Sequence, residues 1–405
     1  MKHPSPRLFR SGVLALTLAF GLGDAPAQEL APPPSRQRGA FLVPMLTVSE
    51  TFDDNLLFTQ FPEGDFVTRA TASVEMGYRS TAFTFYTAAS RAGDTFSLHP
   101  EFNTTDARTF GHVALAYMPS RSLTLATTAI YLKTLTPSEL NTLTGLSVGR
   151  SLAERAAVIP TMEMRLGQFS TAIGFFTLSD DTLDGRFAGT RTGGLAIDRR
   201  LSGRHTVSVR YERRWFSFSR KDSFRDREKS TADVLTVGWM TDLDAHTVLS
   251  LRAGPRSAKG RVNPEVLASV KRRLKHGRVS LTYTRNQATT LGKVGALDTQ
   301  ALVALYTVRV ARELEISSGP GVYRNALRGF SLSACRLNVE ALWHFSHFFY
   351  LGAGYALDMQ QPDFGADGLI RRGALGARLI VSPPQRRLES PTDVVPDGTD
   401  SQESH

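Results

Sequence analysis

Charged side chains recur at every second position of several otherwise apolar stretches, and they are the best candidates for chemistry in this sequence. Within 206–214, for example, Arg210, Glu212 and Arg214 alternate with Val209 and Tyr211. Guanidinium groups bind carboxylates and phosphates through paired hydrogen bonds, so a row of arginines can bind anions. The residues that share this pattern form the candidate site, and they are Arg69, Arg79, Arg155, Arg165, Arg210, Arg214, Arg336, Arg372, Arg378, Glu75, Glu163, Glu212 and Glu340.

Signals for catalysis or metal binding are weak. The sequence contains no H-E-x-x-H motif and no P-loop. His344 and His347 fall in a predicted turn without a carboxylate or cysteine partner, so we interpret them as loop histidines. Asp180, Asp181 and Asp184 resemble a calcium loop only loosely, and a solvated extracellular loop is the simpler interpretation. We therefore predict that the protein is not an enzyme and has no metal or cofactor.

The stretches that carry the candidate residues have the period of β-strands. Polar and apolar residues alternate in 66–79, 155–166, 206–214, 279–284 and 335–343. Successive side chains of a strand point to opposite faces, so each stretch has one polar and one apolar face. Eight tight polar turns join pairs of strands, at Arg79-Ser80, Pro119-Arg121, Gly167-Gln168, Leu201-Arg204, Asp242-Ala245, Lys275-Arg278, Ala311-Glu313 and Ser346-His347.

The connections predict an all-β fold, a transmembrane antiparallel β-barrel of about 18 strands. Longer polar stretches, such as 53–65, 93–105, 134–151, 217–229 and 359–368, separate the eight hairpins, and further strands are expected at 41–51 and 369–381. Short periplasmic turns and long extracellular loops are typical of outer-membrane barrels. Closure gives every backbone N–H and C=O a partner within the membrane. The alternative is a secreted propeller or tandem sandwich, but no blade repeat is present.

The two ends of the chain differ from the predicted barrel at 41–381. Residues 1–27 combine a basic start, an apolar segment at 11–23 and Ala25-Pro26-Ala27, which predicts a cleaved secretory signal. Residues 28–40 are expected to be a flexible leader, and 382–405 a disordered acidic periplasmic tail. No apolar run after the signal is long enough for a membrane helix, and the single cysteine excludes a disulfide framework. These features predict the outer membrane of a Gram-negative-type bacterium.

The inner face of such a barrel is expected to be positively charged, because arginines outnumber glutamates among the candidate residues. A basic, low-dielectric lumen concentrates anions, which predicts a conduit for an acidic polymer or an anionic solute. A secreted barrel is not expected to bind nucleic acid. Alternatively, Arg–Glu pairs only stiffen the wall. The sequence slightly favours transport, because the few glutamates cannot pair with every arginine.

The opening strand also resembles a known family. Residues 46–56 (LTVSETFDDNL) are similar to the S-E-T-aromatic-x-D-N opening of exopolysaccharide-associated outer-membrane barrels of the β-barrel porin 2 type. The length, the signal and the strand number resemble barrels that work with short periplasmic export proteins of the Wza type, which lack a membrane-crossing part. The resemblance implies a conduit that exports a polysaccharide, and a basic lumen would suit an acidic one.

The last strand suggests how the barrel is assembled. Residues 376–381 look like a signal for the barrel assembly machinery, although a terminal aromatic residue is missing and an acidic tail follows. The expected partners are therefore outer-membrane lipid, this machinery, a Wza-type export protein and the polysaccharide. Two other functions remain open, a general anion-preferring diffusion porin and a structural or adhesive barrel whose long loops act outside the cell.

Overall fold

A computed structural model describes residues 39–219, 228–290, 295–327, 330–361 and 368–383. The predicted signal, most of the leader and nearly all of the tail lie outside these ranges. No helix within them is long and apolar enough to span a membrane. The strands are β1 (Gly39–Asp53), β2 (Asp65–Arg79), β3 (Phe83–Phe96), β4 (Thr104–Ser120), β5 (Leu123–Thr134), β6 (Ala153–Arg165), β7 (Ser170–Leu183), β8 (Arg186–Arg200), β9 (His205–Ser219), β10 (Glu228–Asp242), β11 (Thr247–Ala258), β12 (Arg261–Leu274), β13 (Gly277–Ala288), β14 (Leu297–Arg309), β15 (Leu314–Ser318), β16 (Gly321–Leu327), β17 (Phe330–His344), β18 (Phe349–Gln360) and β19 (Ile370–Val381), with short 3-10 helices η3 (Pro100–Phe102) and η4 (Pro137–Leu140).

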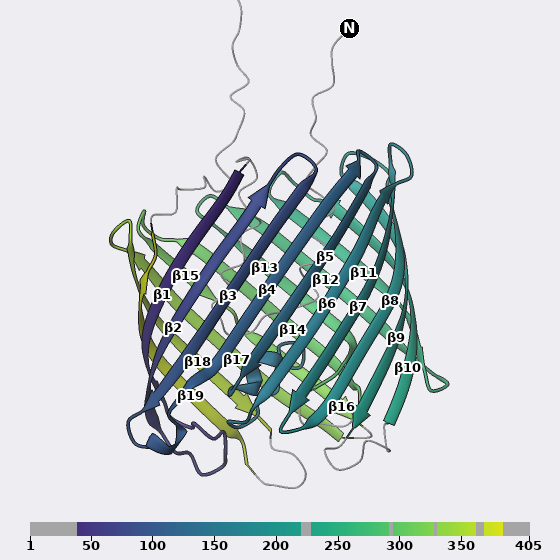
Figure 1. Ribbon diagram of the computed structural model, residues 1–405. Helices are drawn as coiled ribbons and strands as arrows, with labels where there is room; N and C mark the ends of the chain where they lie inside the picture. Colours follow the sequence, from purple (N-terminus) through teal and green to yellow (C-terminus); the bar gives the residue numbers. More distant parts are fainter. Residues whose placement is uncertain (1–38, 220–227, 291–294, 328–329, 362–367, 384–405) are drawn as a thin grey trace, which may run out of the picture.

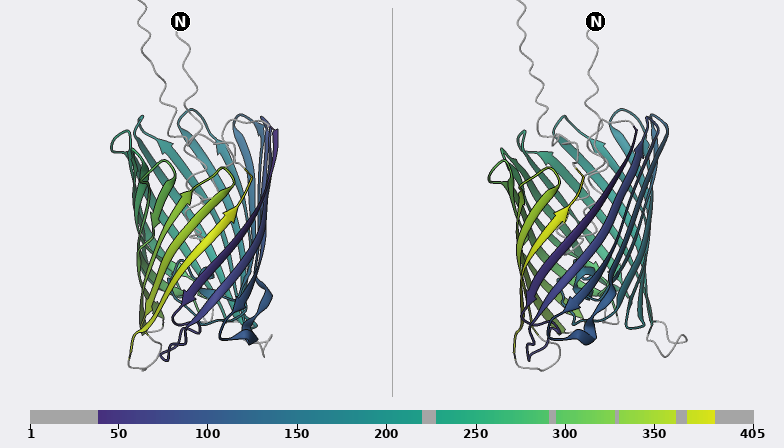
Figure 2. Two further views of the ribbon diagram at one scale, coloured as in Figure 1. Left: turned by 90° about the vertical axis from the view of Figure 1, so that its left-hand side faces the viewer. Right: turned by 60° about the vertical axis from the view of Figure 1, so that its left-hand side comes forward.

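These strands form one closed antiparallel sheet (Figures 1 and 2). Each strand pairs with its neighbours in the sequence, and β19 pairs with β1 from Leu46↔Val381 to Asp53↔Ala374. Closure leaves no strand edge unpaired, which is what a sheet surrounded by lipid requires. The predicted fold class, an outer-membrane type of β-barrel, is confirmed.

The strand number also agrees with the prediction, because β15 and β16 are two halves of one strand. Both halves pair with β14 and with β17. Between them, Gly319 donates to the Asn338 carbonyl and the Pro320 carbonyl accepts from Ala304. Proline has no N–H to donate, so the ladder is interrupted there without a change of direction. The barrel therefore has 18 strands.

All eight predicted turns are present on one rim, where β1 begins and β19 ends. They connect β2 to β3, β4 to β5, β6 to β7, β8 to β9, β10 to β11, β12 to β13, β14 to β15 and β17 to β18, over two to four residues each. Connections on the other rim include the stretches 54–64, 97–103 and 135–152. The asymmetry read from the sequence is therefore real.

Two connections on the long-loop rim differ from the prediction because they are tight turns. Asp184-Gly185 joins β7 to β8 and Lys259-Gly260 joins β11 to β12. All four residues have positive φ angles between 47° and 78°, as two-residue type I′ hairpins require. Asp180 and Asp181 consequently belong to strand β7, and the solvated loop expected at 180–184 was wrong.

The outer face of the barrel is apolar and exposed. In β1, the side chains of Leu42, Leu46 and Val48 alternate with the less exposed Val43, Thr47 and Ser49. A band of this kind is costly in water and is stable against hydrocarbon.

We expect Val237→Arg to impair assembly, because this outward valine is 61% exposed on the apolar band. An arginine facing lipid costs about 2–4 kcal/mol at the bilayer midplane. Val158→Arg and Val339→Arg should act in the same way, since both side chains also face outward. The measurement is the amount of heat-modifiable barrel on gels. Thr282→Arg on the inner face is the control, and equal assembly of all four variants would contradict a lipid-facing band.

Orientation is tested by surface labelling. A tag in the stretch 53–65, whose Phe61 is highly exposed, should be labelled on intact cells, as should a tag in 217–229. A tag in the turn 201–204 should be labelled only after the outer membrane is opened. Labelling of that turn on intact cells would reverse the assignment of the rims.

Candidate functional site

The candidate residues lie on the inner face of the barrel. Arg69 and Glu75 alternate with the exposed Ala70 and Met76 in β2, and the same alternation holds in β6, β9, β17 and β19. Whether these residues take part in translocation remains a prediction.

Four of the arginines make cross-strand ion pairs with aspartates that the sequence prediction did not include. Arg69 Nε lies 2.7 Å from Asp94 Oδ1, and Arg155 Nε lies 2.7 Å from Asp181 Oδ1. A second bond joins each of these pairs, so both are bidentate. Arg336 pairs with Asp358 at 2.9 Å, and Arg372 pairs with Asp53 at 2.5 Å. Counting only glutamates therefore overestimated the free positive charge of the lumen.

The other candidate residues have different surroundings. Arg378 pairs with Glu340 two strands away, and its side chain passes over Gly352, where a Cβ atom would lie 2.8 Å from Arg378 Cγ. Glu75 lies next to Tyr86, and Glu163 lies close to Asp198. Arg79 and Arg165, near the short-turn rim, also have interaction partners.

A larger group of charges occupies the inner face of β9, β11 and β12, and we call it the arginine cluster. It comprises Arg210, Glu212, Arg214, Arg252, Arg256 and Glu265. Arg214 Nη2 contacts Glu212 at 2.7 Å and Glu265 at 2.5 Å, and so ties together strands that are not neighbours.

Carboxylates match the arginines of the cluster in number, but one arginine makes no direct ion pair. Arg210 pairs with Glu212, and Arg256 pairs with Glu265 and Asp298. Arg252, by contrast, makes no direct ion pair with any residue that the structure describes, although Glu212, Glu265 and Asp198 are near enough to interact with it electrostatically. With Asp198 and Asp298 included, four carboxylates face the four guanidinium groups of this part of the wall. Arg252 is therefore the guanidinium group most readily available to an anion in the lumen, because it alone of the four makes no direct ion pair with a described residue.

The connection between β5 and β6, residues 135–152, folds into the barrel. It was expected as one of the long connections on the extracellular rim, and it begins and ends on that rim, but the sequence did not predict that it folds inward. Asn325 Nδ2 on β16 donates to the Thr144 carbonyl at 2.8 Å, and the Ser147 N–H donates to Gln360 Oε1 on β18 at 2.8 Å. These partners are more than 170 residues away in the sequence, so the loop crosses the lumen.

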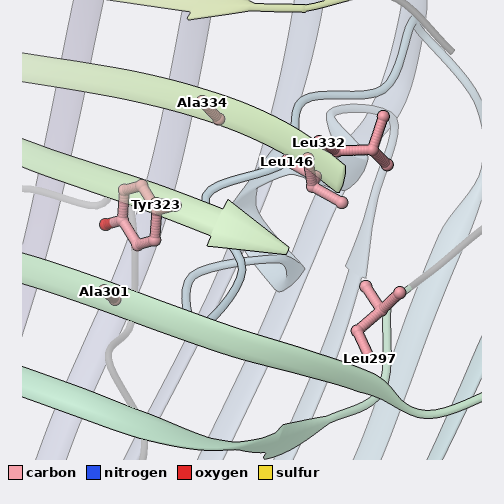
Figure 3. Close-up of a cluster of buried hydrophobic side chains, with 6 residues drawn as sticks. All are labelled: Leu146, Leu297, Ala301, Tyr323, Leu332 and Ala334. Carbon is pink, nitrogen blue, oxygen red and sulfur yellow. The ribbon is translucent and has the colours of Figure 1, made fainter. Parts of the chain in front are cut away.

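Apolar residues in this inner loop explain its position. Leu146 packs against the inner wall in a cluster with Leu297, Ala301, Tyr323, Leu332 and Ala334 (Figure 3). Leu140 is buried with Leu132, Ala153 and Leu183 near the loop's root. Burying such side chains is worth about 1.5–3 kcal/mol each, which favours docking over exposure to water.

Ion pairs anchor the inner loop at both ends. Glu139 Oε2 accepts from Arg108 Nε at 2.8 Å on β4. Arg150 lies 3.7 Å from Asp94 and over the Phe96 ring, 4.5 Å from its centre. The loop therefore contacts β3, β4, β14, β16, β17 and β18. The arginine cluster lies on β9, β11 and β12 and reaches β14 through the Arg256–Asp298 pair.

Residues 145–149 (GLSVG) have the spacing of a G-x-S-x-G nucleophile elbow, in which the serine sits on a turn from a strand to a helix. Here the segment lies in the inner loop, beyond η4, and no strand leads into it. The Ser147 hydroxyl is buried and has no hydrogen-bond partner among the described residues. The histidine at 344 lies far along the chain on β17, with its ring centre 4.6 Å from that of Tyr350.

No protein-family model matches the chain, and no curated protein matches it. Among solved structures, the chain is similar to OccAB4 of Acinetobacter baumannii, with a TM-score of 0.48 and 10% identity over 86% of this chain and 99% of that one. It is also similar to OccK2 of Pseudomonas aeruginosa, with a TM-score of 0.46 and 11% identity over 86% and 100%. The siderophore receptor PirA of Pseudomonas aeruginosa gives a TM-score of 0.43 and 9% identity over 86% and 81%.

Proposed function

We propose that this outer-membrane type of barrel is a conduit for export of a polysaccharide, and that the polymer is acidic. The observation that carries the proposal is the arginine cluster, in which Arg252 has no ion-pair partner among the described residues. The polymer would pass between the inner loop and the wall formed by β9, β11 and β12. A periplasmic Wza-type export protein would deliver it to the short-turn rim.

Electrostatics supports an anionic substrate. An arginine that is not already engaged can bind a carboxylate with both arms of its fork without first breaking a pair. The neighbouring Arg210 and Arg214 share their glutamates, so a passing acidic group would meet several guanidinium groups in succession. Binding at several weak sites allows a polymer to enter and also to leave.

A general anion-preferring diffusion porin is the second candidate, because the inner loop narrows the barrel. Deletion of the gene separates the two functions. If the barrel exports a polymer, the deletion should abolish cell-surface polysaccharide while uptake of small anions continues. Normal surface polysaccharide together with reduced permeability to small anions would favour the porin.

We expect Arg252→Gln to reduce anion preference without reducing the amount of folded barrel. The change removes a charge, and the carboxylates near Arg252 keep other arginine partners. Glu212 and Glu265 both contact Arg214, and Asp198 still lies near Arg210. The measurement is the reversal potential of the purified barrel in a planar bilayer under a salt gradient. Arg204→Gln in an exposed turn is the matched control. Equal reversal potentials for the two variants would argue against the arginine cluster as the selectivity element.

A further inference from the structure

A second feature of the lumen is a row of aromatic rings on the wall away from the arginine cluster. It begins at Phe41 on β1, whose ring centre lies 6.4 Å from that of Tyr86 on β3. Tyr86 lies 5.6 Å from His112 on β4, and His112 stacks with Phe110 at 6.5 Å. Arg108 lies over the Phe110 ring at 5.5 Å. We call Phe41, Tyr86, His112 and Phe110 the aromatic row.

The aromatic row connects the short-turn rim to the inner loop. Phe41 is the third residue of β1, which starts at that rim (Figure 1). Phe110 packs against the apolar cluster around Leu132 and Leu140, and Arg108 holds Glu139 of the inner loop. A molecule arriving from the short-turn side would therefore meet the rings before it reaches the narrow part of the lumen.

Packing of an aromatic ring over a glycine in the wall explains only part of the aromatic row. The Phe41 ring lies over Gly77, where a Cβ atom would come within 2.5 Å of the ring, so one aromatic residue replaces a missing side chain. Phe175 on β7 does the same over Gly194, and it contacts the Arg210 guanidinium group, 4.1 Å from the ring centre, and no second ring among the described residues. Packing at a glycine therefore needs one ring, and it accounts for neither His112 nor Phe110.

Polar groups accompany the rings. His112 Nδ1 is buried and has no hydrogen-bond partner among the described residues. A buried polar atom without a hydrogen-bond partner destabilises the folded protein, and a ligand that forms the missing hydrogen bond removes this cost. Glu75 lies next to the Tyr86 hydroxyl, so hydrogen-bonding groups and ring faces occupy the same strip of wall.

We propose that the aromatic row is a binding track for sugar rings, which rests on and deepens the proposed export of a polysaccharide. A pyranose has an apolar C–H face that packs on an aromatic ring and hydroxyl groups at its edge that need hydrogen-bond partners. Phe41, His112 and Phe110 are partly exposed and would supply the ring faces, whereas Tyr86 is only 5% exposed and joins Phe41 to His112 within the wall. Charge selection by the arginine cluster and ring stacking by the aromatic row act on opposite walls.

The test uses the purified full-length barrel in a planar bilayer, with neutral maltoheptaose added on the short-turn side. A neutral probe separates ring stacking from charge. We expect reversible blockade of the current in the unmodified protein. Phe41→Leu and His112→Leu should each raise the half-blocking concentration about tenfold, because each removes a ring and keeps an apolar side chain of similar bulk.

Phe175→Leu is the matched control, since it removes an inward ring that covers a glycine outside the aromatic row and that contacts Arg210. It should change the half-blocking concentration less than twofold. Heat-modifiable mobility confirms that each variant is folded, and His112→Leu keeps the test valid if Phe41→Leu fails to assemble. No blockade in the unmodified protein, or equal weakening by Phe41→Leu, His112→Leu and Phe175→Leu, would overturn the sugar track.

The reversal potential, measured on the same bilayers, keeps the two proposals separate. Anion preference without sugar blockade overturns the track and leaves the anionic conduit standing. Sugar blockade without anion preference supports the track and contradicts the acidic nature of the polymer.

Discussion

Replacing Arg155 by glutamine should greatly reduce the amount of folded barrel. The guanidinium group forms two bonds with the buried Asp181 carboxylate, at 2.7 and 2.8 Å. Removing one partner of a buried pair leaves the other charge uncompensated, which costs about 3–5 kcal/mol. The measurement is heat-modifiable mobility and unfolding in urea of the barrel in detergent.

The double variant Arg155→Gln/Asp181→Asn should recover most of the lost stability, because neither remaining side chain carries a charge. Arg252→Gln is the control and should leave the folded amount unchanged. The same reasoning applies to Arg69 and Arg336, each of which has an aspartate partner. Full assembly of Arg155→Gln alone would show that the ion pair contributes little to the stability of the barrel. Arg155 would then remain a candidate for a role in transport.

Replacing Gly145 by valine should increase the single-channel conductance several-fold, because it prevents the inner loop from docking. Gly145 has a φ angle of +62°, and an added Cβ atom would lie 2.2 Å from the Tyr323 ring. A β-branched residue is strained in this left-handed conformation and also collides with the wall. The loop must therefore leave its site, which widens the passage.

Gly167→Val is the matched control, since an added Cβ atom at this turn glycine meets nothing within 4 Å. Removing residues 138–148 and joining the ends with glycines should increase the conductance at least as much as Gly145→Val. Unchanged conductance after this deletion would mean that the inner loop does not limit the passage.

The aspartate partners of the arginines could have been predicted from the sequence. In a hairpin, residues equally distant from the turn lie opposite each other. Counting outward from the predicted turn at Gly167-Gln168 brings Arg155 opposite residue 180 or 181, and the observed register is Arg155↔Asp181. The same count around Ser346-His347 brings Arg336 close to Asp358, which is its partner. These pairs are local to one hairpin, so turn position alone determines them.

The sequence by itself determined the strands, their two faces and the short turns, because alternation and turn chemistry act over neighbouring residues. The tertiary structure alone decided three things. Closure brought β19 against β1. Curvature of the wall brought Arg214 to Glu265 across two intervening strands. The inner loop lies in the lumen because Leu146 packs into an apolar site on the inner wall, formed by residues that begin about 150 positions later in the sequence. Each of these three contacts depends on which surfaces face each other in the closed barrel, and a pattern among neighbouring residues does not specify that.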